Sequence, residues 1–313
     1  MIRKVVKHGP ATFVISLPSK WVKQYGINKG DELEVQENGS EITVSTHQTK
    51  NQGNVEVDAT NLDRSSLTYL IRVLYKLGYE EISLQFKDQT TIYHRLGTKR
   101  TVISVIHEEL NRLSGMEVIQ QKENLCVIKA LSELTYSQFD PMLRRIFFMI
   151  VDMSEDLVKA AEKQDTSLLE TLEEKHNTIT KFLSFCMRIL LKRGYGNSKH
   201  TAILFSLLMM IDKVLDTLKN TSRQLLKWGS KCSKNTINLM MIIHQSIAYF
   251  CQMYYKFDNS KVMFISELRD KVPKDIWKNI DEISKGELII VTSIAQIMEL
   301  VFAMTELRIT MEY

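Results

Sequence analysis

Short apolar runs separated by turn-forming residues fill the start of the chain and predict small strands. Two partly β-branched runs, 2–6 and 11–15, flank Lys7-His8-Gly9-Pro10, which indicates a strand, a turn and a strand. Residues 19–25 then predict a short helix, and Gly26 is the glycine that commonly ends one. The opening thirty residues therefore predict a hairpin followed by a single helix.

A second hairpin is predicted immediately afterwards. Apolar positions at 33 and 35, and again at 42 and 44, alternate with polar ones on either side of Asn38-Gly39. Asn-Gly between two alternating runs is the strongest short-range hairpin signal. The polar, glycine-containing residues 47–54 that follow indicate a linker.

Strand and helix patterns alternate in the middle of the chain, which predicts a small α/β sandwich. The expected elements are a strand over 55–58, a helix over 65–77, a strand around 82–86, a helix over 98–113 and strands over 116–121 and 125–130. Arg95, Gly97, Thr98, Lys99 and Arg100 come where the second helix is expected to begin, and a helix start can hold an anion. An ordinary solvated helix start is the preferred interpretation.

The remainder of the chain has helical periodicity and few prolines. Six helices are predicted, over about 140–163, 167–193, 198–228, 235–257, 260–284 and 287–311. Asp140-Pro141 is predicted as a cap followed by the first helical residue, and Ser167 with Glu170 and Ser284 with Glu287 have capping-box spacing. Short turns predict antiparallel neighbours, and a faint repeat of residues 163–167 at 256–260 predicts two sets of three helices.

Charge is distributed unevenly along the chain. The first acidic residue is Asp31, and the stretch before it contains six lysines and arginines. The net charge of the whole chain is only +4, so the basic character is local. Such a one-sided stretch suits a polyanion. The candidate phosphate contacts are Arg3, Lys4, Lys7, Lys20 and Lys23.

The cysteine spacing and the apolar stretches of the sequence indicate which cellular compartment to expect. The four cysteines are far apart and have no Cys-x-x-Cys spacing, so neither a zinc knuckle nor a disulfide framework is expected. No signal sequence opens the chain, and the apolar stretch 288–304 is interrupted by polar residues, which favours a buried helix over a membrane span. A cytoplasmic protein without membrane insertion is expected.

Three motifs in the opening segment resemble the SpoVT/AbrB family of DNA-binding swapped-hairpin domains. They are Lys7-His8-Gly9, Ile15-Ser16-Leu17-Pro18, and Trp21 followed by Gly26-Ile27-Asn28-Lys29-Gly30-Asp31. The resemblance implies a β-barrel that two chains build together, with the basic side chains of the first hairpin on DNA. Size leads to the same expectation, because under fifty residues cannot bury an adequate core alone.

Acidic pairs interrupt the apolar face of two of the predicted helices. Asp152 and Asp156 lie on the first and Asp212 and Asp216 on the third, each pair on one helix face. At about 1.5 Å per residue, both pairs stand at the same height as His176 on the antiparallel second helix. These five side chains, with Glu173 as a further candidate on the second helix, could hold a hard or borderline cation. The alternative is two solvated pairs balanced by lysines, namely Lys159, Lys213 and Lys219.

Residues 205–226, with Asp212-Lys213-Val214-Leu215-Asp216 inside them, resemble the signature helix of the PhoU family of phosphate-signalling proteins. The resemblance implies two three-helix bundles whose acidic motifs bind iron, zinc, magnesium or manganese. Together the two resemblances imply a multidomain α+β protein: an AbrB-like swapped-hairpin barrel (1–48), a small α/β sandwich (54–132) and a PhoU-like all-α domain (138–313).

The sequence offers no nucleophile with a positioned base and no nucleotide fingerprint, so no enzyme is expected. The preferred hypothesis is a homodimeric, archaeal-type regulator that binds double-stranded DNA and is linked to phosphate homeostasis. Its helical half would sense metal or dock a phosphate-transporter ATPase or a signalling protein. The alternatives are a metal-dependent adaptor that controls a transporter without DNA, an antitoxin whose helical half wraps a toxin, and, last, a metal-dependent hydrolase.

Overall fold

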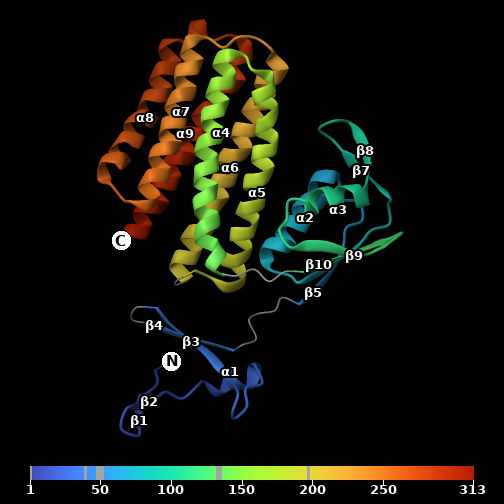
Figure 1. Ribbon diagram of the computed structural model, residues 1–313, viewed down its shortest axis with the longest axis vertical. Coiled ribbons are helices and arrows are strands. Elements are labelled where there is room, and N and C mark those ends of the chain that lie inside the picture. The colour runs from blue at the N-terminus through green and yellow to red at the C-terminus, as the bar shows by residue number, and fades with distance from the viewer. Residues whose placement is uncertain (1, 39–40, 47–52, 132–135, 196–197) are drawn as a thin grey trace. The chain divides into compact units, whose positions relative to one another are not determined.

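The computed structural model describes residues 2–38, 41–46, 53–131, 136–195 and 198–313. The chain divides into two compact units, Met1–Lys50 and Asn51–Tyr313. The first contains short strands and one short helix, and the second contains a small α/β layer and a large set of helices (Figure 1). The chain is therefore multidomain, with N-terminal strands and a mainly helical C-terminal region, as the sequence predicts.

The two strands of the first N-terminal hairpin lie closer to the turn than the sequence predicts. Strands β1 (Val6–His8) and β2 (Thr12–Val14) pair antiparallel, with Lys7 opposite Phe13. The prediction of a strand over 2–6 and a turn from Lys7 was wrong, because Gly9 takes a left-handed conformation (φ 79°) and the chain reverses after His8. Lys7 is consequently a strand residue.

Helix α1 (Ser19–Gln24) follows and ends before Gly26, which has φ 61°. Its exit is fixed by a small turn in which the Asn28 backbone N–H donates to the Asp31 carboxylate at 2.7 Å. Strands β3 (Leu33–Asn38) and β4 (Glu41–Thr46) then form the second antiparallel pair. Of the predicted Asn-Gly turn, residues 39 and 40 lie outside the described residues.

The α/β layer is a four-stranded sheet with helices on one face (Figure 1). Its strands are β5 (Asn54–Asp58), β6 (Glu81–Gln85), β9 (Met116–Lys122) and β10 (Leu125–Ala130), in the order β5-β6-β10-β9. Helix α2 (Arg64–Leu77) connects the parallel pair β5 and β6. Ile71 of α2 packs with Leu84 and Ile128 of the sheet in a core of its own.

One predicted helix of this layer begins later than expected. Residues 90–101 form a separate hairpin, in which β7 (Thr90–Tyr93) pairs with β8 (Thr98–Thr101). Helix α3 begins only after this hairpin and spans Val102–Leu110. Thr101 is the N-cap, its hydroxyl accepting from the Ser104 N–H. The suggestion that Arg95 to Arg100 sit at a helix start was therefore wrong, since those residues belong to a hairpin whose turn includes Gly97 at φ 64°.

Six long helices follow and stand side by side (Figure 1). They are α4 (Phe139–Lys163), α5 (Thr166–Arg193), α6 (Ser198–Trp228), α7 (Lys234–Tyr255), α8 (Asn259–Lys278) and α9 (Lys285–Glu312). Helices α4, α5 and α6 pack on one another, and so do α7, α8 and α9. The two sets meet where α4 packs on α7 and α6 packs on α9. The buried apolar side chains of all six belong to one continuous core.

The helix caps agree with the sequence in some places and correct it in others. Ser284 and Glu287 form the predicted capping box at the start of α9. At α5 the N-cap is Asp165 and not Ser167, and α4 begins at Phe139 with Asp140 already in its first turn. Both helix starts were predicted at the wrong residue, because several neighbouring side chains there carry an oxygen that can accept from the free N–H groups of the first helical turn. Asp258 caps α8 as Asp165 caps α5, so the predicted repeat marks equivalent helix starts.

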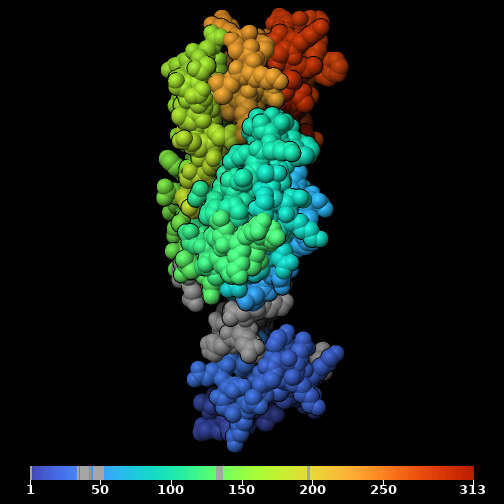
Figure 2. All heavy atoms as spheres, turned by 90° about the vertical axis from the view of Figure 1, so that its right-hand side faces the viewer, coloured from blue at the N-terminus to red at the C-terminus, as the bar shows by residue number. Residues whose placement is uncertain are grey.

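A buried arginine joins the α/β layer to the helical region, against which the layer lies (Figure 2), with α2 packed on α5. Arg188 of α5 is 2 % exposed and donates to the carbonyls of Tyr75 (2.5 Å) and Tyr79 (2.9 Å), at the end of α2. Its guanidinium also lies 4.8 Å from the centre of the Tyr75 ring. Tyr75 lies in the last turn of α2, where carbonyls lack the usual helical donor, and its oxygen also accepts from the Gly78 N–H at 3.0 Å, while Tyr79 lies just beyond the helix. Arg188 thus caps α2 from the neighbouring helix.

Helix α9 is, within the described part of the chain, the one helix long and apolar enough to cross a membrane. Length and composition alone give this result, and a core helix of a soluble protein passes the same test. In the structure α9 packs against α6, α7 and α8, and Ile290, Ile294 and Val301 are buried there.

Candidate functional site

The five predicted DNA contacts are exposed in the N-terminal unit. Lys7 lies in β1, and Lys20 and Lys23 lie on α1. Arg3 and Lys4 precede β1 in the same segment. Among the residues that the structure describes, none of the five has an ion-pair partner. Cations without neutralising acids are free to exchange their counterions for phosphates.

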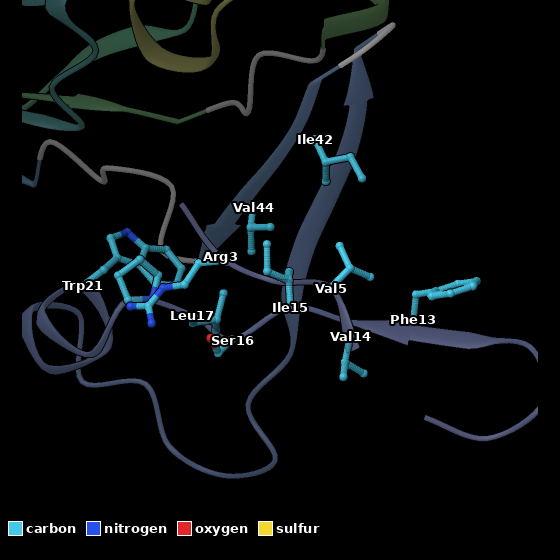
Figure 3. A pocket seen from close by; sticks show the side chains of 11 residues that line it. Arg3, Val5, Phe13, Val14, Ile15, Ser16, Leu17, Trp21, Ile42 and Val44 are labelled. Atoms are coloured by element: carbon cyan, nitrogen blue, oxygen red, sulfur yellow. The ribbon is translucent and has the colours of Figure 1, made fainter. Parts of the chain in front are cut away.

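An apolar groove of about 600 Å³ adjoins these cations. Apart from Arg3 and Ser16, its lining is apolar, with side chains from the first hairpin, the start of α1 and β4 (Figure 3). Phe13 and Ile42 are each 68 % exposed and Val5 is 64 % exposed. Monomeric soluble proteins rarely expose contiguous apolar surface of this kind without a function for it.

The N-terminal unit has no interior of its own. No described side chain between residues 2 and 46 is buried, and none belongs to either apolar core of the molecule. Folding of a chain this short costs more conformational entropy than its exposed apolar side chains can offset. The groove residues must therefore be covered by another surface for this unit to be stable.

The predicted metal ligands of α4 are held by a lysine. Lys175 of α5 donates to Asp152 at 2.5 Å and also to Asp156. Burial on its own would lower the pKa of Lys175, but the two carboxylates outweigh it and raise that pKa. The ammonium group therefore stays charged between the two aspartates, which relieves the repulsion expected of carboxylates four residues apart.

A second, separate group forms around His176. Its Nε2 atom lies 3.0 Å from Asp216 Oδ1 and 3.1 Å from Lys219 Nζ, and Lys219 also donates to Asp216 at 2.6 Å. Burial alone would raise the pKa of Asp216, but the hydrogen bonds from His176 and Lys219 hold it well below its usual value. Asp216 is thus an anion matched by an ammonium group of its own helix.

Asp212 belongs to neither group. It is 9 % exposed on α6 and faces the α/β layer, where its charge acts on Arg72 and Lys76 of α2. Burial lowers the pKa of Lys76, and the Asp212 carboxylate partly offsets that effect. This aspartate therefore interacts electrostatically with cations of α2 and not with the other predicted ligands.

The five predicted ligands do not fit a metal ion as they stand. Within the described ranges, no three His, Cys, Asp or Glu side chains are grouped so that they could hold one. Two lysine ammonium groups occupy the positions next to the carboxylates where a cation would be needed. Of the lysines that the sequence suggested as balancing charges, Lys219 has this role, while Lys159 pairs with Glu155. Lys175 was not anticipated.

Sequence reasoning also missed the groove. It predicted dimerisation from size and from kinship, but it did not identify Phe13, Ile15 and Ile42 as a shared apolar surface. The available signal was the presence of large apolar residues in a segment that has no partner element of its own. The predicted cations, by contrast, are all where a ligand can reach them.

Comparison with known proteins identifies the N-terminal segment only. Residues 9–52, about a seventh of the chain, match the family model described as antidote-toxin recognition MazE, bacterial antitoxin. No curated protein and no solved structure matches the chain. The matched segment includes β2, α1, β3 and β4, and it supports an AbrB-type DNA-binding domain at the N-terminus.

Proposed function

We propose that the chain is a homodimeric DNA-binding regulator that acts in the cytoplasm. Two copies of Met1–Lys50 interleave their hairpins, so that the apolar groove of each is covered by the other. Arg3, Lys4 and Lys7 of both copies then grip the DNA backbone, and Lys20 and Lys23 add flanking phosphate contacts. The observation that carries the proposal is the absence of any buried described side chain in a unit with five unpaired cations.

Salt dependence of DNA binding tests this proposal. Affinity for duplex DNA should fall steeply with KCl, because each neutralised phosphate contributes a slope of about −0.9 in log K against log salt. Lys4→Glu/Lys7→Glu removes two cations per copy, so the slope should become shallower by roughly 3 to 4 and the affinity should drop at every salt concentration.

The matched control reverses two charges elsewhere. Lys271→Glu/Lys274→Glu alters the same number of exposed lysines on α8 and should leave the DNA affinity unchanged. Equal binding by the wild type and the N-terminal variant, or equal losses in both variants, would remove the DNA interface from Arg3, Lys4 and Lys7.

We further propose that the helical half links this regulator to phosphate uptake, as a PhoU-like module that docks a transporter ATPase or a signalling protein. Six helices with a repeated Asp cap at Asp165 and Asp258 support this assignment. No catalytic step and no metal ion form part of the proposal. Coupling requires the partner to bind the two DNA-competent arrangements of the dimer unequally.

Phosphate supply is the variable that tests this link. DNA occupancy in cells should change when inorganic phosphate is depleted, and deletion of the chain should abolish the change in the transporter transcripts. If phosphate transport changes while DNA occupancy does not, and the Lys4→Glu/Lys7→Glu variant restores transport control, the adaptor alternative is correct instead.

The matched family description also supports a second candidate, an antitoxin. In that case the helical half would cover a toxin, and the N-terminal unit would serve autoregulation. Depletion of the chain should then arrest growth, and the Lys4→Glu/Lys7→Glu variant should rescue it, because neutralisation needs no DNA. Unimpaired growth after depletion would exclude this candidate.

A further inference from the structure

A polar cavity of about 360 Å³ lies at the end of the helical half where α9 finishes, marked C in Figure 1. It lies between the start of α4, the segment after α5 and the last turns of α7 and α9. Asp140, Arg144, Tyr195, Tyr254, Tyr255 and Arg308 provide its polar lining. A cavity of this volume is within the usual range for a small-molecule site.

Arg308 is a buried and firmly held cation of this cavity. It is 9 % exposed, its Nε donates to the Tyr254 carbonyl at 3.0 Å and its Nη1 donates to Glu312 at 2.9 Å. Its guanidinium also lies 5.0 Å from the centre of the Phe257 ring. A guanidinium has five N–H donors, so these two bonds orient the group and leave donors for a ligand.

Arg144 contributes a second guanidinium that is not engaged in an ion pair with any described residue. It stands 5.5 Å from the centre of the Tyr255 ring, and no described carboxylate lies within ion-pair distance of it. Asp140, the acid of the cavity, already accepts from the Tyr195 hydroxyl at 3.0 Å. Arg308 is paired with Glu312, so Arg144 is the guanidinium of the cavity that no ion pair among the described residues holds.

Three tyrosines form an aromatic wall beside these cations. Tyr254 and Tyr255 contact each other edge to face at 5.1 Å, and Tyr254 packs on Phe147 at 4.7 Å. Burial raises the pKa of Tyr255 to about 12, so its hydroxyl is neutral and can donate at physiological pH. Fixed aromatic rings of this kind stack on planar ligands at a small entropic cost.

We propose that this cavity binds a nucleoside monophosphate, with the phosphate between Arg144 and Arg308 and the base against Tyr254 and Tyr255. Paired guanidiniums favour a phosphate because they donate charge-assisted hydrogen bonds to several of its oxygens. The aromatic wall adds a requirement for a ring, which inorganic phosphate does not meet. The cavity lining includes none of the predicted DNA contacts and none of the predicted metal ligands.

Calorimetric titration of the full chain with AMP, adenosine and inorganic phosphate tests the site. AMP should bind saturably, and adenosine and phosphate should each bind at least about tenfold more weakly, since each lacks one of the two recognition elements. AMP should also raise the melting temperature of the helical half, because it binds only the folded chain. Saturation by AMP that phosphate alone reproduces would contradict the role of the ring.

Arg144→Met and Arg145→Met form a matched pair of variants. Both arginines are exposed on α4 next to each other, and each lies over an aromatic ring, but Arg145 lies over Phe182 and does not line the cavity. Arg144→Met should weaken AMP binding at least about tenfold and Arg145→Met should not change it, with both melting temperatures unaltered. Equal losses in the two variants, or no AMP binding by the wild type, would overturn the proposal.

Discussion

The N-terminal unit and the helical half differ in how their apolar side chains are buried and in how their charges are paired. In the helical half, buried side chains from all six helices meet in one core, and Asp152, Asp156 and Asp216 have lysine partners. In the N-terminal unit no described side chain is buried, large apolar residues are exposed and the predicted DNA contacts have no ion pairs.

This contrast separates the part that is complete in one chain from the part that needs others. Apolar surface is stabilising only once it is removed from water, so the N-terminal unit requires a cover. Unpaired cations similarly provide a site only where a polyanion can replace their counterions. The helical half, by contrast, has a core of its own and a cavity lined by α4, α7 and α9.

The largest expected effect comes from the groove. Phe13→Ser/Ile42→Ser should convert the dimer to a monomer and abolish DNA binding, because it removes two large apolar side chains from each copy of the shared surface. Light scattering measures the change in mass. Phe148→Ser is the control, since Phe148 is 74 % exposed on α4 and should leave the mass unchanged. A variant that stays dimeric would place the dimer interface elsewhere.

A substitution in the helical core should lower the stability of the chain without changing its oligomeric state. Leu208→Ala in α6 should lower the free energy of unfolding by about 2–5 kcal/mol and leave the dimer intact, because Leu208 is fully buried in the helical core. Met209→Ala, next to it and 37 % exposed, should cost much less. Chemical denaturation followed by circular dichroism gives both values. Similar losses at the two positions would contradict the described packing.

The joint between the α/β layer and α5 should show a smaller effect. Arg188→Met removes the guanidinium donors to the Tyr75 and Tyr79 carbonyls, of which Tyr75 keeps the Gly78 N–H, at a cost of about 1–3 kcal/mol. Hydrogen exchange should accelerate at the end of α2. Arg193→Met, on the exposed last turn of the same helix, should leave that exchange rate unchanged. Protection of α2 that survives Arg188→Met would show that another contact holds the layer.

Acid should affect the helical half slightly and specifically. The pKa of Asp216 is lower in the folded chain than in the unfolded one, so its stabilising effect is complete above its ordinary pKa of 3.8 and is lost as the pH falls below that value. Glu173, whose pKa is lowered by Arg223 against the opposing effect of burial, acts in the same direction. Unfolding measured from pH 6 to pH 3 should show less acid sensitivity in Asp216→Asn than in the wild type.

Local patterns predicted most elements of the fold. The two N-terminal hairpins, α2, the sheet strands and six long helices all follow from periodicity and from turn residues. The register of the first hairpin was harder to predict, because it depends on which residue of the turn takes the left-handed conformation. That residue is Gly9, directly after the last residue of β1. The β7–β8 hairpin was missed because its residues 90–101 lack a clear alternation.

The candidate sites were predictable only as residue types. Exposed cations before Asp31 could be identified from charge alone. The arrangement of Asp152, Asp156 and Asp216 could not, because helix height does not indicate which lysine reaches a carboxylate from the neighbouring turn or helix. Metal binding by these residues stays a prediction, and removal of Lys175 and Lys219 is the substitution that would open their carboxylates to a cation.

The most direct test of the account is the mass of the full chain, alone and on duplex DNA, measured by sedimentation equilibrium. One chain has a mass of 36.3 kDa, so a dimer of about 73 kDa is expected, with two chains bound to each DNA site. A 36.3 kDa species that binds DNA with its groove still accessible to solvent would contradict it.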